Sequence, residues 1–321
     1  MDKKTILITG GAGFIGRGLT ARLQKEGYNV RILTRRDPST IEQQGVEFAH
    51  GDYGDAASLR KAMEGCFAVY HLAAAISAHS KEEFYRANTL STKNMVDAAS
   101  AVPGLECFVY VSSLAAGGPS ADPAKPRDEN LPPSPVSAYG ETKLGGEKEV
   151  ARLPANIRRV VLRPPIVYGK YDAGISKIAR WVKRGIMINM CAGDTYFNFI
   201  YLDDLVECLY RAMADVKLAG GTYFVCTPKQ YTWLYFIAEM AKAMKKPMPK
   251  IITLSPGQMM FVGRIYQVVA KVFRLEPVFN PDKAVEASAG NWIASPALWM
   301  EKSGFKEWTP LEEGLKRTFG E

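Results

Sequence analysis

The sequence predicts an α/β fold in which helices cover both faces of a doubly wound parallel sheet. Apolar stretches of strand length alternate with amphipathic stretches of helix length through about residue 165. The first apolar stretch, Thr5–Thr9, runs directly into a glycine-rich turn and a helix over residues 17–26. Two later strands, at residues 68–75 and Cys107–Val111, end in small or polar residues, as the ligand-facing ends of parallel strands often do.

The composition limits the classes of protein to which this chain can belong. The chain has 321 residues, of which 47% are hydrophobic and 23% charged, as in soluble globular proteins. No apolar stretch approaches the ~20 residues that span a bilayer, so we expect no stable membrane insertion and a cytoplasmic location. The basic residues behind the net charge of +8 interleave with acids, which favours anionic ligands over nucleic acid. Scattered cysteines indicate reduced thiols: Cys66, Cys107, Cys191, Cys208 and Cys226.

The glycine-rich turn predicts a pyrophosphate site. Unpaired N–H groups and the positive end of the helix dipole meet at a helix N-terminus and favour an anion. Glycines there let the backbone approach a ligand without a Cβ in the way. We expect the turn to contact a dinucleotide through Gly10, Gly13, Phe14, Ile15 and Gly16.

The next strands predict how the rest of that cofactor is held. After the strand Asn29–Thr34, Thr34 occupies the position where an acid binds ribose hydroxyls, and Arg35 and Arg36 follow it. Arginines there accommodate a 2′-phosphate, so we expect NADP(H) to be preferred, with NAD(H) as the alternative.

A strand at 46–49 leads to Asp52 and Tyr53. Asp52 either accepts a hydrogen bond from the adenine amino group or caps the helix starting near Ala56. The strand at 68–75 ends in small residues, where a flat cofactor lies against Leu72, Ala73 and Ala74. His71 belongs to no cluster with metal-ligand spacing, so we expect a structural histidine and no metal.

Residues 81–101 show a helical pattern that contains Asn88, and the strand Cys107–Val111 ends at Ser112 and Ser113. Residues 117–135 carry many prolines and glycines and predict a loop over the strand ends. In the following helix, Tyr139 and Lys143 are four apart and share one face. Three glycines in that helix require a close neighbour, either the cofactor or a packed helix: Gly140, Gly145 and Gly146.

Ser113, Tyr139 and Lys143 together predict proton transfer coupled to hydride transfer. A phenol with a pKa of ~10 is a weak acid or base at neutral pH. A lysine ammonium or a nicotinamide cation beside it favours the phenolate and lowers that pKa. Tyr139 then exchanges a proton with a substrate hydroxyl or carbonyl, and Ser113 holds the same oxygen.

The second half of the chain alternates less regularly. We expect strands at 160–163, 197–201 and 221–225, a helix at 203–214, and a packed amphipathic helix at 259–273. The predicted division is a dinucleotide-binding domain over 1–165 with a returning segment near 195–226. A substrate domain then comprises 166–194 and 227–321.

The sequence resembles the extended short-chain dehydrogenase/reductase superfamily, that is, the NAD(P)-dependent epimerase/dehydratase family. The resemblance covers nearly the whole chain and implies a Rossmann domain of about seven strands with a smaller, mostly helical C-terminal substrate domain. The matching segments are 9–16, 71–74, Ser112-Ser113, Tyr139-Gly140-Glu141-Thr142-Lys143, 163–169, 199–205 and 311–315.

The resemblance implies a role for each matching residue. Tyr139 is the acid/base, Lys143 binds the ribose and tunes Tyr139, and Ser113 binds the substrate oxygen. Asn88 completes the catalytic set as the family's structural asparagine, and Asp203 is a helix cap. Pro164 and Ile166 join the cofactor site. Members often form homodimers through the helices that match residues 81–101 and 138–153, and we expect one here.

Three functions are compatible with these residues: a net redox enzyme, a nucleotide-sugar epimerase or dehydratase, and a cofactor-binding regulator without turnover. The intact catalytic set disfavours the regulator. Sugar-nucleotide members commonly carry an asparagine where this chain has Ile166 and an arginine where it has Phe197. Further apolar residues follow: Met187, Met190, Met259, Met260 and Phe261. We therefore expect a small, largely apolar carbonyl or alcohol substrate, as in the dihydroflavonol-reductase-like and hydroxysteroid-dehydrogenase-like members.

Overall fold

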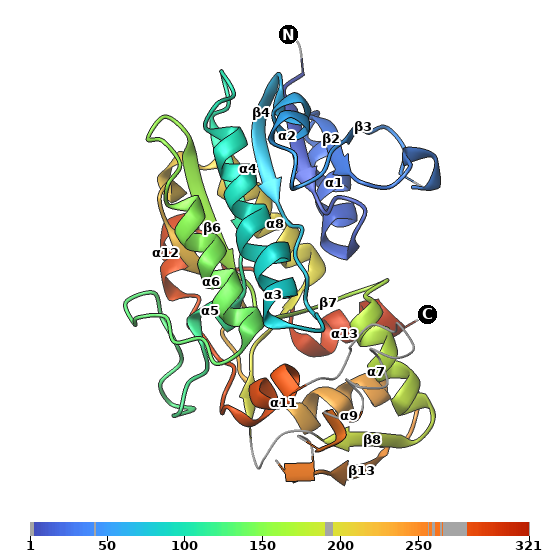
Figure 1. Ribbon diagram of the computed structural model, residues 1–321. Coiled ribbons are helices and arrows are strands. Elements are labelled where there is room, and N and C mark those ends of the chain that lie inside the picture. Colours follow the sequence, from blue (N-terminus) through green and yellow to red (C-terminus); the bar gives the residue numbers. More distant parts are fainter. Residues whose placement is uncertain are drawn as a thin grey trace.

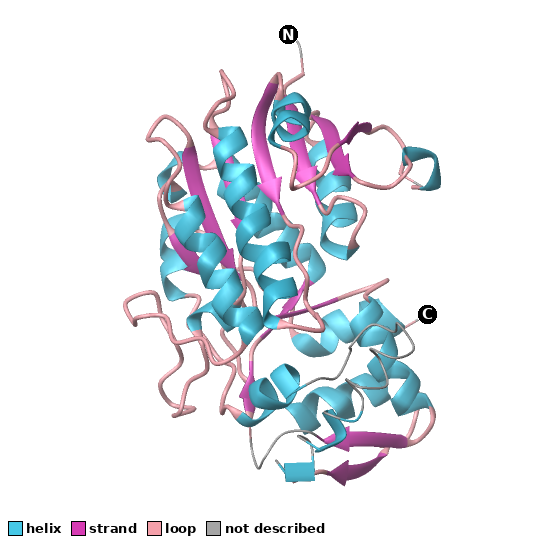
Figure 2. Ribbon diagram, in the orientation of Figure 1, coloured by secondary structure: helices cyan, strands magenta, loops and turns pink. Residues whose placement is uncertain are grey.

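The computed structural model describes residues 3–41, 43–189, 195–255, 257–258, 261–263, 265 and 281–320. Within these residues, seven parallel strands form the central sheet in the order β11–β6–β5–β4–β1–β2–β3 (Figures 1 and 2). The order reverses between β1 and β4, which makes the sheet doubly wound. The predicted α/β class is confirmed. The strands are β1 Thr5–Thr9, β2 Asn29–Thr34, β3 Glu47–His50, β4 Cys66–His71, β5 Cys107–Val111, β6 Arg158–Arg163 and β11 Thr222–Phe224.

The alternation of side chains along each strand supplies two apolar faces. In β1, Ile6 and Ile8 are buried on one face with residues of α1 and α8, whereas Leu7 is buried on the other with α2 and α4. Figure 1 shows α4 and α6 in front of the sheet and α8 behind it. The helices of this part are α1 Phe14–Lys25, α2 Ala56–Met63, α4 Ser91–Ala99, α5 Leu114–Gly117, α6 Ala138–Val150 and α8 Leu202–Ala214.

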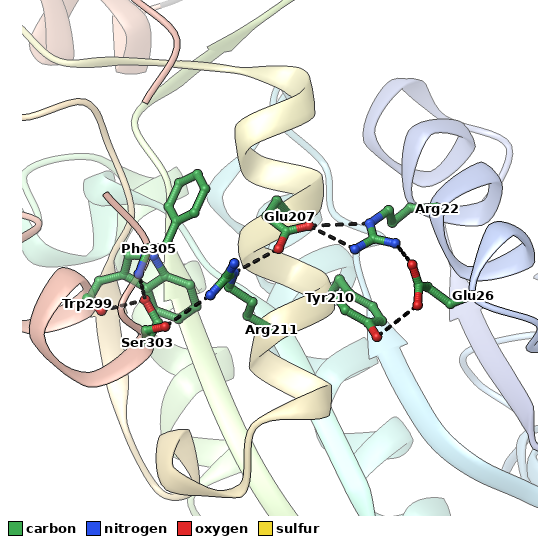
Figure 3. A network of polar contacts seen from close by, with 8 residues as sticks. All are labelled: Arg22, Glu26, Glu207, Tyr210, Arg211, Trp299, Ser303 and Phe305. Atoms are coloured by element: carbon green, nitrogen blue, oxygen red, sulfur yellow. Dashed lines mark hydrogen bonds and ion pairs between the residues drawn. The ribbon is translucent and has the colours of Figure 1, made fainter. Parts of the chain in front are cut away.

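A polar network ties α1, α8 and α12 (Ala297–Ser303) together on the face of the sheet that α1 and α8 cover (Figure 3). Glu207 of α8 accepts from Arg22 of α1 at 3.1 Å and from Arg211 at 2.7 Å. Arg211 also donates to the carbonyl of Ser303 at 3.1 Å, and its guanidinium lies 5.4 Å from the ring centroid of Phe305. The network therefore holds α12 against α8, which covers this face of the sheet.

The helix expected at 81–101 runs from Lys81 to Ala99, but its pitch changes within it. It comprises α3 Lys81–Phe84, a π-helical segment η2 Tyr85–Leu90 and α4. Such π segments recur at functional sites because they turn side chains out of the regular α-helical pattern. Asn88 lies in this segment.

The lower part of Figure 1 is a smaller unit of short sheets and helices. Its core is aromatic: Phe199 and Phe236 stack with ring centroids 4.5 Å apart, and Tyr168 is fully buried beside them. Its strands are β7 Ile166–Tyr168, β8 Ile186–Asn189, β9 Tyr196–Phe197, β10 Phe199–Tyr201, β12 Tyr231–Thr232 and β13 Lys250–Thr253. Its helices are α7 Ala173–Lys183, α9 Trp233–Ala243, α11 Pro281–Ser288 and α13 Leu311–Phe319.

The single strand expected at 197–201 is wrong, because Asn198 interrupts it between β9 and β10. The Asn198 side chain donates to the carbonyls of Thr227 and Lys229 and accepts from the N–H of Ala294 at 2.7 Å. These three hydrogen bonds between the Asn198 side chain and backbone groups take the place of regular strand pairing at this residue.

Residues 297–308 return to the central sheet, before α13 rejoins the smaller unit. Trp299 of α12 is fully buried with the sheet residues, and its ring meets that of Tyr223 at 5.6 Å. The domain division given above stays a prediction, and this segment packs with the first of the two predicted units. Most of the helix expected over 259–273 lies outside the described residues, as do Met190, Cys191, Met259 and Met260.

Two predicted helix caps are wrong. Asp55, rather than Asp52, caps α2 by accepting from the N–H of Ala57 at 2.9 Å. No side chain caps α8, where Asp203 lies in the first turn. Its neighbour Asp204 is buried and accepts from Thr309 at 2.7 and 2.8 Å. In the described part of the chain, every helix is too short or too polar to cross a membrane.

Candidate active site

The turn between β1 and α1 forms a backbone cradle. Gly10 adopts a φ of +69°, which favours glycine, and Gly13 is the N-cap of α1, so no side chain caps this helix. A Cβ on Gly16 would overlap the carbonyl oxygen of Gly10. The chain therefore folds tightly enough to present the start of α1 to an anion.

Two cavities meet at this turn. The first, of about 660 Å³, is lined by Phe14, Ile15, Gly16, Leu72, Ser113, Tyr139, Lys143, Pro164 and Ile166. The second, of about 940 Å³, is lined by Arg35, Arg36, Asp52, Tyr53 and Ala73. Gly10, Gly13 and Ala74 line both. All the residues that we predicted to bind the cofactor thus lie along one path across the carboxyl edge of the sheet.

The second cavity brings together the residues expected near the adenosine. Thr34 ends β2, and its hydroxyl accepts from the N–H of Arg36 at 2.9 Å. The Arg35 guanidinium lies 5.9 Å from the ring centroid of Tyr53. Asp52 uses one carboxylate oxygen to accept from the N–H of Gly54 at 2.7 Å. Its contact with an adenine stays a prediction.

Asn88 joins the end of β4 to helix α6. Its amide accepts from the N–H of Ala75 at 2.8 Å and donates to the carbonyl of the same residue at 3.1 Å. It also donates to the hydroxyl of Thr142 at 3.1 Å. In this structure Asn88 therefore positions the loop at Ala75 and the helix that carries Tyr139 and Lys143. Its place in the catalytic set stays a prediction.

The glycines of α6 explain how closely that helix packs. A Cβ on Gly145 would meet Thr89 of the π segment at 2.5 Å, and a Cβ on Gly146 would overlap the hydroxyl of Tyr110 on β5. Thr89 also donates to the carbonyl of Thr142 at 2.9 Å. Of the two alternatives left open by the sequence, a packed helix is what Gly145 meets, whereas Gly146 meets a side chain of the strand β5.

Ser113 and Tyr139 converge at the wall of the first cavity. Ser113 follows β5 and caps the short helix α5, accepting from the N–H of Ala115 at 3.1 Å. Burial raises the pKa of the Tyr139 phenol, and the nearby Lys283 ammonium and a hydrogen bond with Ser113 oppose that rise. Two hydroxyls thus meet at the wall of this cavity.

Lys143 lies one helical turn after Tyr139 and is almost completely buried. Its ammonium donates to the carbonyl of Val111 at 2.7 Å and lies 4.3 Å from the ring centroid of Tyr110. Burial lowers the pKa of Lys143 to about 7, although Glu147 opposes this. That Lys143 binds a ribose and tunes Tyr139 stays a prediction.

A buried ion pair holds the strand ends beneath these residues. The Arg163 guanidinium donates to the Glu147 carboxylate at 2.9 and 2.6 Å. Glu147 also accepts from the hydroxyl of Ser112 at 2.5 Å. This network connects β5, β6 and α6, so the positions of Ser113 and Tyr139 are linked through it.

The structure adds residues from α11 that the sequence did not indicate. Asp282 accepts from the N–H groups of Ala138 and Tyr139, and Lys283 and Glu286 line the first cavity. A lysine and a glutamate three apart on a helix usually form a surface ion pair, so no local signal marks them. Trp233 and Trp292 also line this cavity and were not predicted.

The residues present fit a nicotinamide dinucleotide. The cradle has no room for a Cβ at Gly16 and little at Gly10, where a Cβ would lie 3.1 Å from the backbone nitrogen of Ala73. It lies at the start of α1, which suits a pyrophosphate. The described residues hold no group of three potential metal ligands. The ring of His71 bonds the hydroxyls of Thr9 and Thr92, in agreement with a structural role.

Comparison with known proteins gives a consistent result. The family model described as "NAD dependent epimerase/dehydratase family" matches residues 6–226. The ceramide reductase of Caulobacter vibrioides is 26% identical over 317 residues, which are 98% of this chain and 90% of that protein. A 3beta-hydroxysteroid-dehydrogenase/decarboxylase of Arabidopsis thaliana is 25% identical over 349 residues, with coverages of 97% and 78%.

Another relative, an uncharacterized protein of Sinorhizobium fredii, is 33% identical over 220 residues. These are 67% of this chain, which spans 54% of that protein. Among solved structures, MoeE5 in complex with UDP-glucuronic acid and NAD superposes with a TM-score of 0.78 at 23% identity, covering 98% of this chain and 97% of that one. At this identity the likeness shows the fold.

Proposed function

Because the chain belongs to the NAD dependent epimerase/dehydratase family, we propose that it is an NADP(H)-dependent oxidoreductase acting on a carbonyl or alcohol of a small, largely apolar substrate. It is an enzyme of the extended short-chain dehydrogenase/reductase superfamily, whose members include reductases, dehydrogenases and epimerases. The observation that carries the proposal is the convergence of Ser113 and Tyr139 on a cavity that also contains Ile166 and Phe197.

The proposed chemistry assigns one task to each residue. A bound nicotinamide supplies or accepts the hydride. In reduction, the Tyr139 phenol donates its proton to the substrate oxygen; in oxidation, the phenolate accepts the proton of the substrate hydroxyl. Ser113 holds the same oxygen by a hydrogen bond and orients it toward Tyr139. Lys143, held at Val111, adds positive charge beneath the site when it is protonated, and its pKa is about 7.

The substrate class follows from the lining of the first cavity. Its wall away from the glycine turn is formed by apolar side chains, among them Ile76, Ile166, Val167, Phe197, Trp233 and Trp292. A sugar nucleotide carries a second pyrophosphate, which needs donors and positive charge. Lys283 is a cation on this wall, and it is paired with Glu286 at 2.6 Å. The cavity therefore suits an apolar substrate better than a second pyrophosphate.

Spectrophotometric assays test the proposal directly. Purified protein is offered NADPH or NADP⁺ with panels of apolar ketones, aldehydes and secondary alcohols. We expect stoichiometric oxidation or reduction of the cofactor with at least one apolar substrate. Calorimetry with UDP-, GDP- and dTDP-sugars is the counter-test. Saturable micromolar binding of such a sugar, absent for the free nucleotide, overturns the proposal in favour of an epimerase or dehydratase.

The NADP(H) preference rests on Arg35 and Arg36. Both guanidinium groups are exposed, and both residues line the second cavity at the end of β2. Thr34 supplies no carboxylate to repel a 2′-phosphate. A charge-assisted contact of this type contributes ~1.5–3 kcal/mol, which is roughly ten- to a hundredfold in affinity.

A further inference from the structure

We propose that Lys283 of α11 is a positioning residue for proton transfer, whose ammonium stabilises the phenolate form of Tyr139. The inference deepens the proposed function and rests on it for the role of Tyr139. It assigns a task to α11, a helix 143 positions after Tyr139 that docks on the start of the catalytic helix α6.

The contact between the two helices is specific. The Asp282 carboxylate accepts from the N–H of Ala138 at 2.6 Å and from the N–H of Tyr139 at 3.3 Å. Glu286 accepts from the hydroxyl of Ser137 at 2.7 Å, and that hydroxyl in turn caps α6 by accepting from the N–H of Gly140 at 3.0 Å. The two carboxylates therefore lie at the positive end of the α6 dipole, which stabilises them and holds α11 in place.

This docking puts Lys283 beside the phenol. Its ammonium lies 5.1 Å from the ring centroid of Tyr139, and both residues line the first cavity. The Glu286 carboxylate accepts from the ammonium at 2.6 Å, and the indole N–H of Trp292 donates to the Glu286 carbonyl at 2.8 Å. Lys283 is thus held at its distance by a built network.

The charges around Tyr139 favour the loss of its phenol proton. A cation within ~4–6 Å favours the ionised phenol, and partial removal from water strengthens the interaction. Glu286, which is paired with the ammonium, has the opposite effect on the pKa of Tyr139, and this effect is smaller than that of Lys283. The phenol also contacts Ser113, which is uncharged, and Phe84, which is apolar and whose ring centroid is 6.1 Å from that of Tyr139. The titratable groups that act electrostatically on the phenol are Tyr110, Lys283 and Glu286. The neighbouring elements also carry Lys143 on α6, Asp282 on α11, and Lys81, Glu82 and Glu83 on α3.

No atom is transferred to or from Lys283 in this scheme. The proton passes between the Tyr139 oxygen and the substrate oxygen, and the ammonium lowers the cost of the negative charge left on Tyr139. The expected consequence is a phenolate available at lower pH than burial alone would allow. In oxidation at neutral pH, removing the charge should reduce kcat/KM about tenfold.

The test compares Lys283→Met and Lys283→Gln, which remove the charge, with Lys283→Arg, which retains it. Lys242→Met is the matched control, because Lys242 pairs with Glu239 three residues earlier on α9 and is exposed. Circular dichroism establishes that each variant is folded. In the oxidation direction, we expect the acidic limb of the kcat/KM profile, along which the Tyr139 phenolate forms, to move to higher pH in both charge-removing variants. It should return toward wild type in Lys283→Arg and be unchanged in Lys242→Met.

A second readout needs no turnover. Calorimetry in buffers of different ionisation enthalpy counts the protons released when NADP⁺ binds, because the nicotinamide cation favours the Tyr139 phenolate. Proton release that wild type shows and Tyr139→Phe lacks comes from the Tyr139 phenol. The pH range of this proton release should be higher in Lys283→Met. Identical release profiles of wild type and Lys283→Met, or of wild type and Tyr139→Phe, overturn the inference. Failure of the substrate panels, with this shift observed, rejects the proposed function alone.

Discussion

The hydroxyl of Thr9 lies 2.7 Å from Nδ1 of His71 and joins the two central strands at the edge where the cofactor site begins. The same hydroxyl accepts from the N–H groups of Leu72 and Ala73 at 3.1 Å, so it donates to Nδ1. The ring proton is therefore on Nε2, which donates to Thr92 at 3.1 Å. Burial, and to a lesser degree Lys143, lowers the pKa of His71 to about 3.

This bond predicts how stability depends on pH. The pKa of His71 is lower in the folded protein than its ordinary unfolded value of ~6.5, so protonation favours unfolding. The contribution of neutral His71 to the free energy of unfolding is complete above pH ~6.5. It is lost progressively as the pH falls toward 3. We expect urea unfolding to show stability falling by up to ~1.4 kcal/mol per pH unit in this window. His71→Gln should flatten the dependence and cost ~1–3 kcal/mol at pH 7.

The control for that measurement is His50→Gln, since His50 is exposed at the end of β3. It should keep the pH dependence of the wild type. A dependence that survives intact in His71→Gln would mean that other groups produce it.

Replacing Tyr139 by phenylalanine should remove proton transfer and keep the ring that packs against Phe84. We expect turnover to fall by roughly 10²–10⁴ while cofactor affinity stays close to that of the wild type. Steady-state kinetics and cofactor titration measure the two effects. Tyr171→Phe, at a side chain that is 84% exposed, is the control and should retain turnover. Undiminished turnover in Tyr139→Phe would sink the assignment.

Arg35→Ala should weaken binding of NADP(H) roughly ten- to a hundredfold and leave NAD(H) almost unaffected. The reason is that only NADP(H) carries the 2′-phosphate expected beside Arg35, at the mouth of the second cavity. Fluorescence titration with both cofactors measures the ratio, and NAD(H) serves as the internal control. Equal or tighter binding of NAD(H) by the wild type would reject the predicted preference.

Breaking the buried pair of Glu147 and Arg163 should destabilise the protein strongly. Their side chains are only 9% and 6% exposed, so Glu147→Ala leaves an uncompensated buried guanidinium. We expect a loss of ~3–5 kcal/mol in the free energy of unfolding. The surface pair of Lys93 and Asp97 is the comparison, and Asp97→Ala should cost no more than ~1 kcal/mol. A similar loss in both variants would contradict a burial-dependent role.

The helices flanking β5 are the expected homodimer interface, by resemblance to the family. Light scattering at micromolar concentration should give twice the chain mass of 35.4 kDa. Arg152, two residues after the end of α6, and Asp97 of α4 form an exposed ion pair at 3.2 Å. A charge reversal at Asp97 should weaken a dimer that buries this surface. A monomer in the wild type would contradict the prediction.

Local order in the sequence determined most of the fold and the core of the site. Successive side chains of a strand point to opposite faces of the sheet, so Ile6 and Leu7 pack in two different cores. A spacing of four on a helix puts Tyr139 and Lys143 on one face whatever surrounds them. The glycine turn has a conformation that few other residues tolerate, and it can therefore be identified from the sequence.

Only the tertiary structure decided what surrounds those residues. Asn198 ends a strand because three distant backbone groups meet its amide, and Lys283 lies beside Tyr139 because α11 docks on the start of α6. Neither position has a local signal, since an asparagine in an apolar run or a lysine three residues before a glutamate occurs in many settings. Spacing along the chain fixes which side chains share a face, whereas the packing of separate elements fixes which faces meet.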